Sequence, residues 1–258
     1  MFVRPKKALG QHFLKDHNIA RKIVDALEAP ANNVLEVGPG TGILTKYLLE
    51  KETLNCCFLD TDREAYDYLR KSFSDHTEKF VKADFLEVDP DKFFKGPYSV
   101  IGNLPYNISS QIFFKILEHR NKVPEVVAMI QREVADRISS PPGSKQYGIL
   151  SVLLQAFYEI DFLFGVNPQV FDPPPKVKSA VIRLKRNNLT DLPCDEKKFF
   201  LVVKQAFNYR RKTLRNSLKS IATKPEVLDR EIFNKRPEQL STEDFQKLTQ
   251  LLFPNIPQ

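Results

Sequence analysis

Residues 98–107 read Tyr98-Ser99-Val100-Ile101-Gly102-Asn103-Leu104-Pro105-Tyr106-Asn107. The apolar pair in this stretch is typical of a buried strand, which leads directly into an amide, a proline and an aromatic ring. Asn103 can accept a hydrogen bond from an amine, and Pro105 can hold the Leu104 carbonyl outward as a second acceptor. Tyr106 offers a ring for stacking. The stretch predicts a site for a flat aromatic ligand that carries an amino group. Taken alone, it is equally compatible with a strand-to-helix turn that buries a tyrosine.

A glycine-rich turn follows an earlier predicted strand at 33–37. It reads Gly38-Pro39-Gly40-Thr41-Gly42 and precedes a predicted helix at 43–50. A strand, a glycine turn and a helix are typical of a nucleotide-like ligand lying against a helix N-terminus. The spacing differs from that of dinucleotide-binding turns, and the lysine of a phosphate-binding loop is missing. Glu36, in the strand, is a candidate to orient the turn.

Acidic residues end the next two predicted strands. The strand at 54–59 ends at Asp60, about 20 residues beyond the glycines, where a carboxylate can bind the two hydroxyls of a ribose. The strand at 78–82 precedes Asp84 and Phe85. Asp84 could accept from the amine of an adenine, with Phe85 beside the ring, or it could be an ordinary turn residue.

The pattern of strands and helices continues to about residue 186. Strands are predicted at 98–102 and 125–130, with helices at 64–73, 109–119 and 133–138. The segments 157–166 and 179–185 alternate as an antiparallel pair at the sheet edge. Between them, Phe171 lies among prolines. We expect either a second stacking surface opposite Tyr106 or simple loop packing.

The composition changes near residue 187. A polar linker at 187–195 precedes predicted helices at 197–208, about 225–234 and 242–252, so we expect domains at 1–188 and 189–258. A basic cluster on about two predicted helical turns has no acidic residue within it; its members are Arg210, Arg211, Lys212, Arg215 and Lys219. Like charges this close destabilise a helix unless an anion offsets them. RNA backbone is the predicted anion, and a solvated face is the alternative.

Whole-chain composition favours a polyanionic partner. The 258 residues include 39 Lys and Arg against 32 Asp and Glu, a net charge of +7. Three cysteines, two of them adjacent, argue against a disulfide framework and a zinc site and favour a reducing cytoplasm. No apolar run approaches the about 20 residues that span a bilayer, and no signal-peptide core follows the basic N-terminus.

The order of these motifs resembles that of class I S-adenosylmethionine-dependent methyltransferases, and Asn103-Leu104-Pro105-Tyr106 resembles the element of those that methylate exocyclic amines of bases. Three further segments resemble the ribosomal RNA adenine dimethyltransferase family, in particular its small-subunit branch. They are Lys7-Ala8-Leu9-Gly10-Gln11-His12-Phe13-Leu14, Phe171-Asp172-Pro173-Pro174-Pro175-Lys176-Val177-Lys178-Ser179 and Phe207-Asn208-Tyr209-Arg210-Arg211-Lys212-Thr213-Leu214. The resemblance covers nearly the whole chain. It implies an α/β, Rossmann-like fold with a mainly parallel seven-stranded sheet and a small all-helical C-terminal domain.

The resemblance also implies a reaction. S-adenosylmethionine would donate the methyl groups that dimethylate two adjacent adenosines in the 3′-terminal hairpin loop of small-subunit (16S) rRNA, during late subunit biogenesis. The residues expected at the cofactor are Gln11, His12, Leu14, Glu36, Gly38, Gly40, Asp60, Asp84, Phe85 and Asn103. The residues expected at the target base are Asn103, Leu104, Pro105, Tyr106 and Phe171. Asp60 departs from the family pattern, in which this residue is usually glutamate. We expect a monomer in the cytoplasm, without membrane or metal.

Three alternatives remain open. The antibiotic-resistance branch of the family dimethylates an adenine of large-subunit RNA. An RNA-binding assembly or transcription factor could carry a left-over cofactor pocket, although the intact Asn103-Leu104-Pro105-Tyr106 element favours catalysis. A DNA adenine methyltransferase needs a base-reading domain, for which the C-terminal segment looks small.

Overall fold

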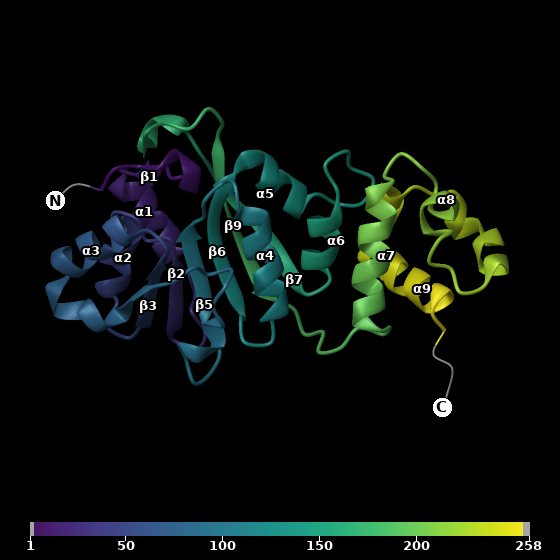
Figure 1. Ribbon diagram of the computed structural model, residues 1–258, viewed down its shortest axis with the longest axis horizontal. Coiled ribbons are helices and arrows are strands. Elements are labelled where there is room, and N and C mark those ends of the chain that lie inside the picture. The colour runs from purple at the N-terminus through teal and green to yellow at the C-terminus, as the bar shows by residue number, and fades with distance from the viewer. Residues whose placement is uncertain (1–2, 255–258) are drawn as a thin grey trace. The chain divides into compact units, whose positions relative to one another are not determined.

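The computed structural model describes residues 3–254, and the chain divides into two compact units (Figure 1). The first contains the chain up to Ala135 and Glu159–Arg186. The second contains Asp136–Tyr158 and the chain from Asn187 onward. The units thus differ from the predicted domains in residues 136–158 and 187–188, which group with the C-terminal helices. The assignment of catalysis to 1–188 and of RNA binding to 189–258 stays a prediction.

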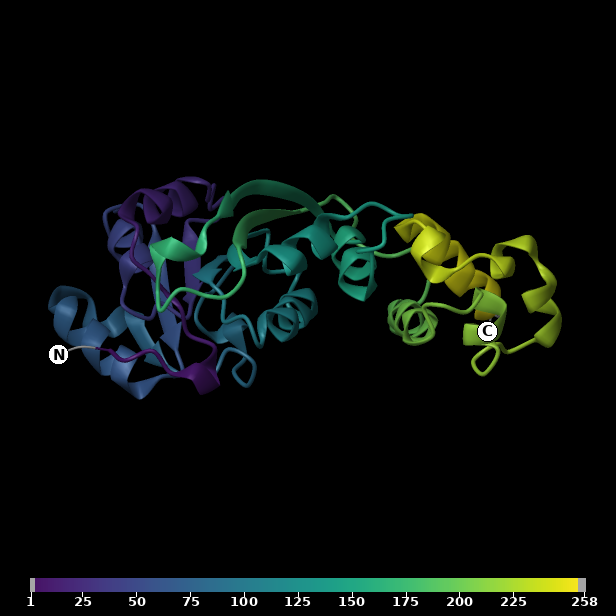
Figure 2. The ribbon, with the colours of Figure 1, turned by 90° about the horizontal axis from the view of Figure 1, so that it is seen from above.

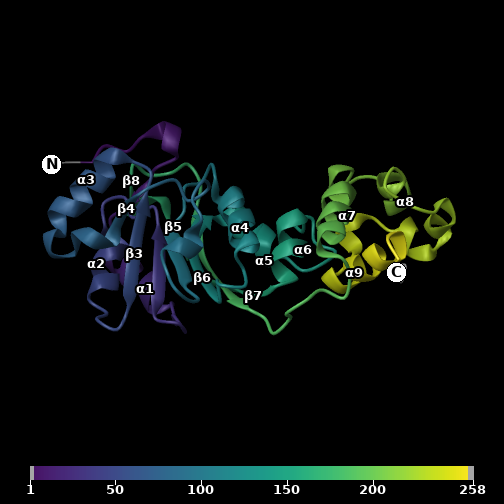
Figure 3. The ribbon, with the colours of Figure 1, turned by 60° about the horizontal axis from the view of Figure 1, so that its bottom comes forward.

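A seven-stranded sheet forms the centre of the first unit (Figure 1; Figure 3). Its strand order is β4-β3-β2-β5-β6-β9-β7. The bounds are β2 Asn33–Val37, β3 Asn55–Asp60, β4 Phe80–Lys82, β5 Ser99–Asn103, β6 Glu125–Gln131, β7 Tyr158–Val166 and β9 Ser179–Arg186. The pairs β2–β3, β3–β4, β2–β5 and β5–β6 are parallel, and β6–β9 is antiparallel. The predicted mainly parallel seven-stranded sheet is confirmed.

Helices accompany these strands. They are α1 His17–Asp25, α2 Ile43–Leu49, α3 Arg63–Ser72, α4 Ser109–Glu118 and α5 Arg132–Ser139. Of these, α2, α3 and α4 connect paired parallel strands. Short 3₁₀ turns lie at Lys7–Leu9, Ser74–Lys79, Pro90–Lys92 and Pro168–Val170. The α1 helix begins where the Asp16 carboxylate accepts from the N–H groups of Asn18 and Ile19, and it buries Ile23 and Val24. Local capping and one apolar stripe therefore explain this helix.

A second, two-stranded sheet was not expected from the sequence. It pairs β1 Phe13–Leu14 with β8 Phe171–Asp172 in antiparallel register, with Leu14 opposite Phe171. Figure 2 shows the purple N-terminal segment beside the green segment that follows β7. The two strands lie more than 150 residues apart in the sequence, and each is only two residues long. Strands this short have no periodicity from which they could be predicted.

The second unit is helical. It contains α6 Ile149–Gln155, α7 Glu196–Asn208, α8 Leu214–Leu218 and α9 Thr242–Leu252, with 3₁₀ turns at Pro225–Asp229, Glu231–Asn234 and Pro237–Gln239. The predicted helix at 225–234 is wrong, because Arg230 takes an extended conformation between two 3₁₀ turns. Residues 209–213 lie in a turn between α7 and α8, so the basic cluster does not lie on one continuous helix. No helix within 3–254 is both long and apolar enough to cross a bilayer.

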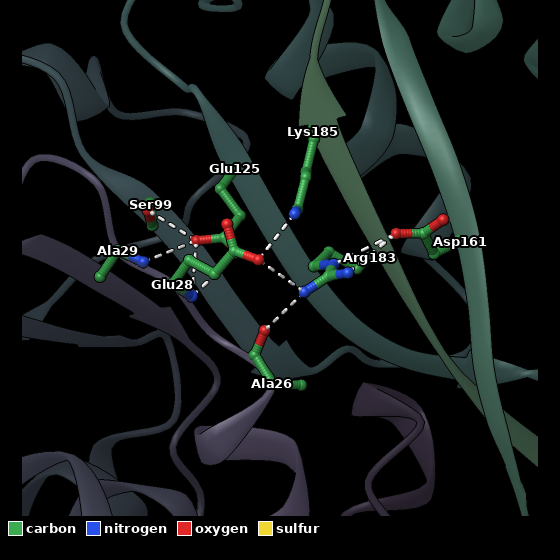
Figure 4. Close-up of polar contacts among 8 residues, drawn as sticks. All are labelled: Ala26, Glu28, Ala29, Ser99, Glu125, Asp161, Arg183 and Lys185. Atoms are coloured by element: carbon green, nitrogen blue, oxygen red, sulfur yellow. Dashed lines mark hydrogen bonds and ion pairs between the residues drawn. The ribbon is translucent and has the colours of Figure 1, made fainter.

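A buried carboxylate fastens the connection between α1 and β2 to the amino end of β6 (Figure 4). Glu125 is 1% exposed and accepts from the N–H groups of Glu28 and Ala29 and from the Ser99 hydroxyl. The Glu28 carboxylate pairs in turn with Arg183 and Lys185 of β9. These contacts explain how Ala29 holds a positive φ of 46° without being glycine.

We expect Glu125→Gln to lower the free energy of unfolding by about 1–3 kcal/mol. The amide would present an N–H group to backbone donors that now share two carboxylate oxygens, so one donor would be left buried and unpaired. Urea denaturation measures the change. Glu52→Gln, in an exposed turn, is the matched control and should leave stability unaltered. Equal stabilities of the two variants would contradict the role given to Glu125.

Candidate active site

A cavity lies at the carboxyl ends of the central parallel strands. It is lined by most of the residues that the sequence predicts for cofactor and base. These are Gln11, His12, Gly38, Gly40, Asp60, Asp84, Phe85, Asn103, Leu104, Pro105 and Tyr106. The same cavity is also lined by residues that the sequence did not single out, among them Leu59, Thr61 and Ile112. The structure therefore gathers one site from segments spread over about 100 residues, because parallel strands end at one edge of the sheet.

The glycine turn lies at one side of this cavity. Gly40 has a φ of +58°, and a Cβ atom there would lie 2.9 Å from the Phe13 ring. Its N–H group donates to the Asp60 carboxylate, with N and Oδ2 3.1 Å apart. Glycine is therefore required at residue 40 both for the left-handed backbone and for the close approach of β1.

Asp60 connects the turn to the end of β3. Its carboxylate is 6% exposed and accepts from the N–H groups of Gly40 and Asp62. Burial raises the pKa of this carboxyl, and the two backbone hydrogen bonds oppose that shift. Each oxygen uses one hydrogen bond here and has a second lone pair, and Asp60 lines the cavity. The carboxylate can therefore accept from the hydroxyls of a ribose while it holds the turn.

Glu36 does not line the cavity, contrary to its place among the expected cofactor residues. It is 1% exposed and accepts from the Thr45 hydroxyl, with Oε2 and Oγ1 2.7 Å apart. Burial raises the pKa of this carboxyl to about 8, although the Thr45 hydrogen bond lowers it. Glu36 thus joins β2 to the beginning of α2. That it orients the glycine turn stays a prediction.

Asp84 and Phe85 line the cavity beyond the end of β4. The Asp84 Oδ1 atom accepts from the Leu86 N–H group at 2.8 Å, which is the ordinary turn contact considered from the sequence. Its other carboxylate oxygen makes no hydrogen bond among the described residues, so the turn role leaves an acceptor for an adenine amine.

Asn103 ends β5 and presents its amide oxygen without a partner in the described part of the chain. The amide nitrogen donates to the His12 carbonyl at 2.8 Å, which sets the orientation of the group. Leu104 donates its N–H group to the Met129 carbonyl. Its own carbonyl accepts no hydrogen bond among residues 3–254. Two acceptors, Asn103 Oδ1 and the Leu104 carbonyl, thus remain for an amine with two hydrogens.

Gly102, just before Asn103, packs tightly against the neighbouring strand. A Cβ atom there would lie 2.5 Å from the Val37 carbonyl oxygen. A side chain at this residue would push β5 away from β2 and displace Asn103. The glycine before the amide is therefore a steric requirement.

Tyr106 is held on its face and at its hydroxyl. The ring stacks on the His12 imidazole with centroids 5.3 Å apart and planes at 29°. The hydroxyl shares a hydrogen bond with Ser179, and burial raises its pKa. The His12 Nδ1 atom donates to the Pro173 carbonyl at 2.7 Å, because a carbonyl can only accept. The site thus ties together the N-terminal segment, the Asn103–Tyr106 element and the proline-rich segment.

Gln11 lines the cavity, but its side chain is bound to the protein. The amide nitrogen donates to Asp62 at 3.1 Å, and the amide oxygen accepts from the Lys6 N–H group. Lys6 also pairs with Asp62, with Nζ and Oδ1 2.5 Å apart. These contacts lower the pKa of Asp62 against the effect of burial. Sequence reasoning missed Lys6 and Asp62, because neither belongs to a motif with a spacing signal. It quoted Ser179 at the end of the proline-rich segment but gave it no role beside Tyr106.

Leu14 and Phe171 do not reach the cavity. Leu14 is 3% and Phe171 0% exposed, both in the main hydrophobic core, opposite one another in the small sheet. A ring that faced an open cavity would be accessible to solvent. The expectation that Phe171 offers a second stacking surface is therefore not met here. Loop packing, the alternative considered from the sequence, is what the structure shows, because burial of the ring is favourable.

The basic cluster lies in the second unit and divides into two groups. Arg215 pairs with Asp229, with Nη1 and Oδ1 2.9 Å apart. Arg210 donates to the Lys145 carbonyl at 2.5 Å. Arg211, Lys212 and Lys219 are exposed and make no ion pair among the described residues. The sequence shows no acidic residue within the cluster, yet Asp229, which lies outside it, neutralises Arg215. RNA binding by the five residues stays a prediction.

Comparisons with known proteins agree with one another. A family model described as "Ribosomal RNA adenine dimethylase" matches residues 3–252. "Ribosomal RNA small subunit methyltransferase A" of Cytophaga hutchinsonii is 53% identical over 252 residues, 97% of this chain and 98% of that protein. The protein of the same name from Parabacteroides distasonis is 54% identical over 250 residues, 96% of this chain and 93% of that protein.

Solved structures are similar in fold. A dimethyladenosine transferase from Plasmodium falciparum aligns with a TM-score of 0.78 and 25% identity, over 92% of this chain and 96% of that one. The 23S rRNA methyltransferase ErmE aligns with a TM-score of 0.65 and 26% identity, over 93% of this chain and 99% of that one. Both alignments extend over the two units of the chain.

We expect the stability of the protein to fall, relative to that of Glu36→Gln, as the pH rises from 5 to 8. A folded-state pKa of about 8 means that the folded protein keeps a proton that the unfolded chain has released. Stability is then lost by up to about 1.4 kcal/mol per pH unit and levels off above the folded pKa. Urea denaturation at several pH values measures the difference in the free energy of unfolding between the two proteins. The contributions of all other titratable groups cancel in this difference, because both proteins contain them. Parallel curves for the two proteins would show that Glu36 is already ionised at pH 5.

Proposed function

The chain belongs to the ribosomal RNA adenine dimethylase family. We propose that it dimethylates two adjacent adenosines in the 3′-terminal hairpin loop of small-subunit (16S) rRNA. This modification would be coupled to late subunit biogenesis. The enzyme is an S-adenosylmethionine-dependent rRNA methyltransferase. The observation that supports adenine amines as the target is the pair of acceptors at Asn103 and Leu104 in the cavity. The small-subunit target follows the name of relatives that are 53–54% identical over nearly the whole chain.

The residues around the cavity fit S-adenosylmethionine. Asp60 offers carboxylate lone pairs to a ribose, and Gly38 and Gly40 line the same cavity with backbone alone. Asp84 with Phe85 suits an adenine ring. When bound, the cofactor supplies an electrophilic methyl group, so the chain needs no covalent nucleophile of its own. Asp60 has one methylene less than the glutamate of the family pattern. A bridging water or a small shift of the turn would restore the contact.

Positioning explains what the chain contributes to the reaction. Asn103 Oδ1 and the Leu104 carbonyl accept the two hydrogens of the amine, which draws the nitrogen lone pair out of conjugation with the ring. Holding the amine in line supplies much of the remaining rate. The nitrogen becomes acidic on methylation, so its proton can pass to water without a dedicated base. After the first transfer one hydrogen remains, and one acceptor is enough to hold it.

The target base must leave its stack to enter the cavity. Tyr106 can pack against it, and its orientation is set by His12 and Ser179. We assign catalysis to residues 1–188 and RNA backbone binding to 189–258, and we propose that the protein acts as a cytoplasmic monomer. Electrostatic contacts with RNA would give binding a steep dependence on salt.

We expect methyl transfer from labelled S-adenosylmethionine to small subunits that lack the modification, with dimethyladenosine as the product. Large subunits and mature small subunits, tested alongside, should take up no label. Nucleoside analysis maps the product. Label in the large subunit would instead assign the protein to the resistance branch. The similarity to the 23S rRNA methyltransferase ErmE is the reason for testing this alternative. Binding to small subunits without any label would favour an RNA-binding factor.

We expect Asn103→Ala to lower the rate of methyl transfer about 100-fold, because the transition state loses a positioned acceptor. Binding to the small subunit should remain within twofold of the original, since the change lies in the cavity. Single-turnover rates and filter binding separate the two effects. Asn55→Ala, an exposed asparagine at the amino end of β3, is the control. Equal losses in both variants would refute the positioning role.

A further inference from the structure

Tyr209 is the most exposed large hydrophobic residue that the structure describes. Its exposed fraction is 55%, against 41% for Leu201 and 46% for Val177. It directly follows the last residue of α7, in the turn before α8. The side chain makes no ring contact and no hydrogen bond within residues 3–254. An aromatic ring therefore projects into solvent from a segment in which the family resemblance gives a role to the basic residues but none to an aromatic side chain.

The turn that carries this ring is well held. The Tyr209 carbonyl accepts from the Lys212 N–H group at 2.8 Å, and the Arg210 N–H group donates to the Phe207 carbonyl. The Arg210 guanidinium donates to the Lys145 carbonyl in the loop between α5 and α6. A ring on a fixed turn loses little conformational entropy on binding a ligand. Arg210 acts here as a structural anchor.

The side chains that follow the ring in the sequence are positively charged, and two of them pair with no acidic residue among those that the structure describes. Arg215 uses its charge on Asp229, and Arg210 is bound to backbone carbonyls. Arg211 and Lys212 follow Tyr209 directly, are exposed and make no ion pair in the described part of the chain. The turn thus presents an aromatic face next to two cations that pair with no residue in the range 3–254. Stacking rings combined with Lys and Arg are typical of sites that bind single-stranded nucleic acid.

We propose that Tyr209 stacks on an unpaired base of the ribosomal RNA while Arg211 and Lys212 contact the flanking phosphates. This proposal rests on the proposed function, which supplies RNA as the partner. Unpaired RNA fits better than a duplex, because a duplex offers phosphates and shape but no base face to a ring. Stacking is tolerant of sequence, since every base has a π-face, so the site reads single-stranded character rather than base identity.

The chain contains no tryptophan, so Tyr209→Trp places a single fluorescent reporter in the turn. We expect unmethylated small subunits to quench its emission, because a base stacks on the indole. Leu201→Trp, exposed on α7, is the matched control and should be quenched far less. Quenching that survives digestion of the RNA by nuclease would overturn the proposal and indicate a protein partner.

Affinity provides an independent measurement. We expect Tyr209→Ala to weaken binding to small subunits about tenfold and Tyr209→Phe to change it less than twofold. Replacing Arg211 and Lys212 with glutamine should reduce the slope of log affinity against log salt by about 1.5. Circular dichroism checks that each variant is folded. If Tyr209→Ala binds with unchanged affinity while the original protein transfers methyl groups normally, the stacking proposal is refuted and the proposed function stands. Absence of methyl transfer by the original protein would refute the proposed function instead.

Discussion

The parallel pairing of β2 with β3 on one side and β5 on the other is the constraint on which the site depends. Parallel strands end at the same edge, so the glycine turn, Asp60 and Asn103 meet there although they are far apart in the sequence. The pairing is tight: the Val37 carbonyl leaves no room for a side chain at residue 102. A small shift between β2 and β5 would therefore move the amide away from the turn.

The N-terminal segment completes the cavity through hydrogen bonds and stacking. The His12 carbonyl accepts from Asn103, the His12 imidazole donates to the Pro173 carbonyl, and its ring lies against Tyr106. Further along, β1 pairs with β8. Each contact is weak alone, yet together they order one segment against two others. Since Asn103 and Tyr106 are oriented by these contacts, the N-terminal segment helps to set the geometry of the cavity that both residues line.

Two buried carboxyl groups of the first unit differ in their hydrogen-bond donors and in the elements that they hold together. Glu125 accepts from two backbone N–H groups and a serine hydroxyl. Glu36 accepts from a single threonine, and burial raises its pKa to about 8. The first therefore fastens the loop before β2 through its hydrogen bonds, whereas the second joins β2 to α2 and keeps its proton below a pH of about 8.

The strands of the sheet, the glycine turn and the Asn103–Tyr106 element could be predicted from the sequence, because strand periodicity and turn residues are local signals. Asp60 and Asp84 were likewise predicted at strand ends, and both line one cavity. The burial of Phe171 with Leu14, the contact of Glu36 with Thr45 and the pairing of Arg215 with Asp229 emerge in the folded chain alone. Those outcomes depend on contacts between distant segments, whose burial and charge pairing no local pattern records.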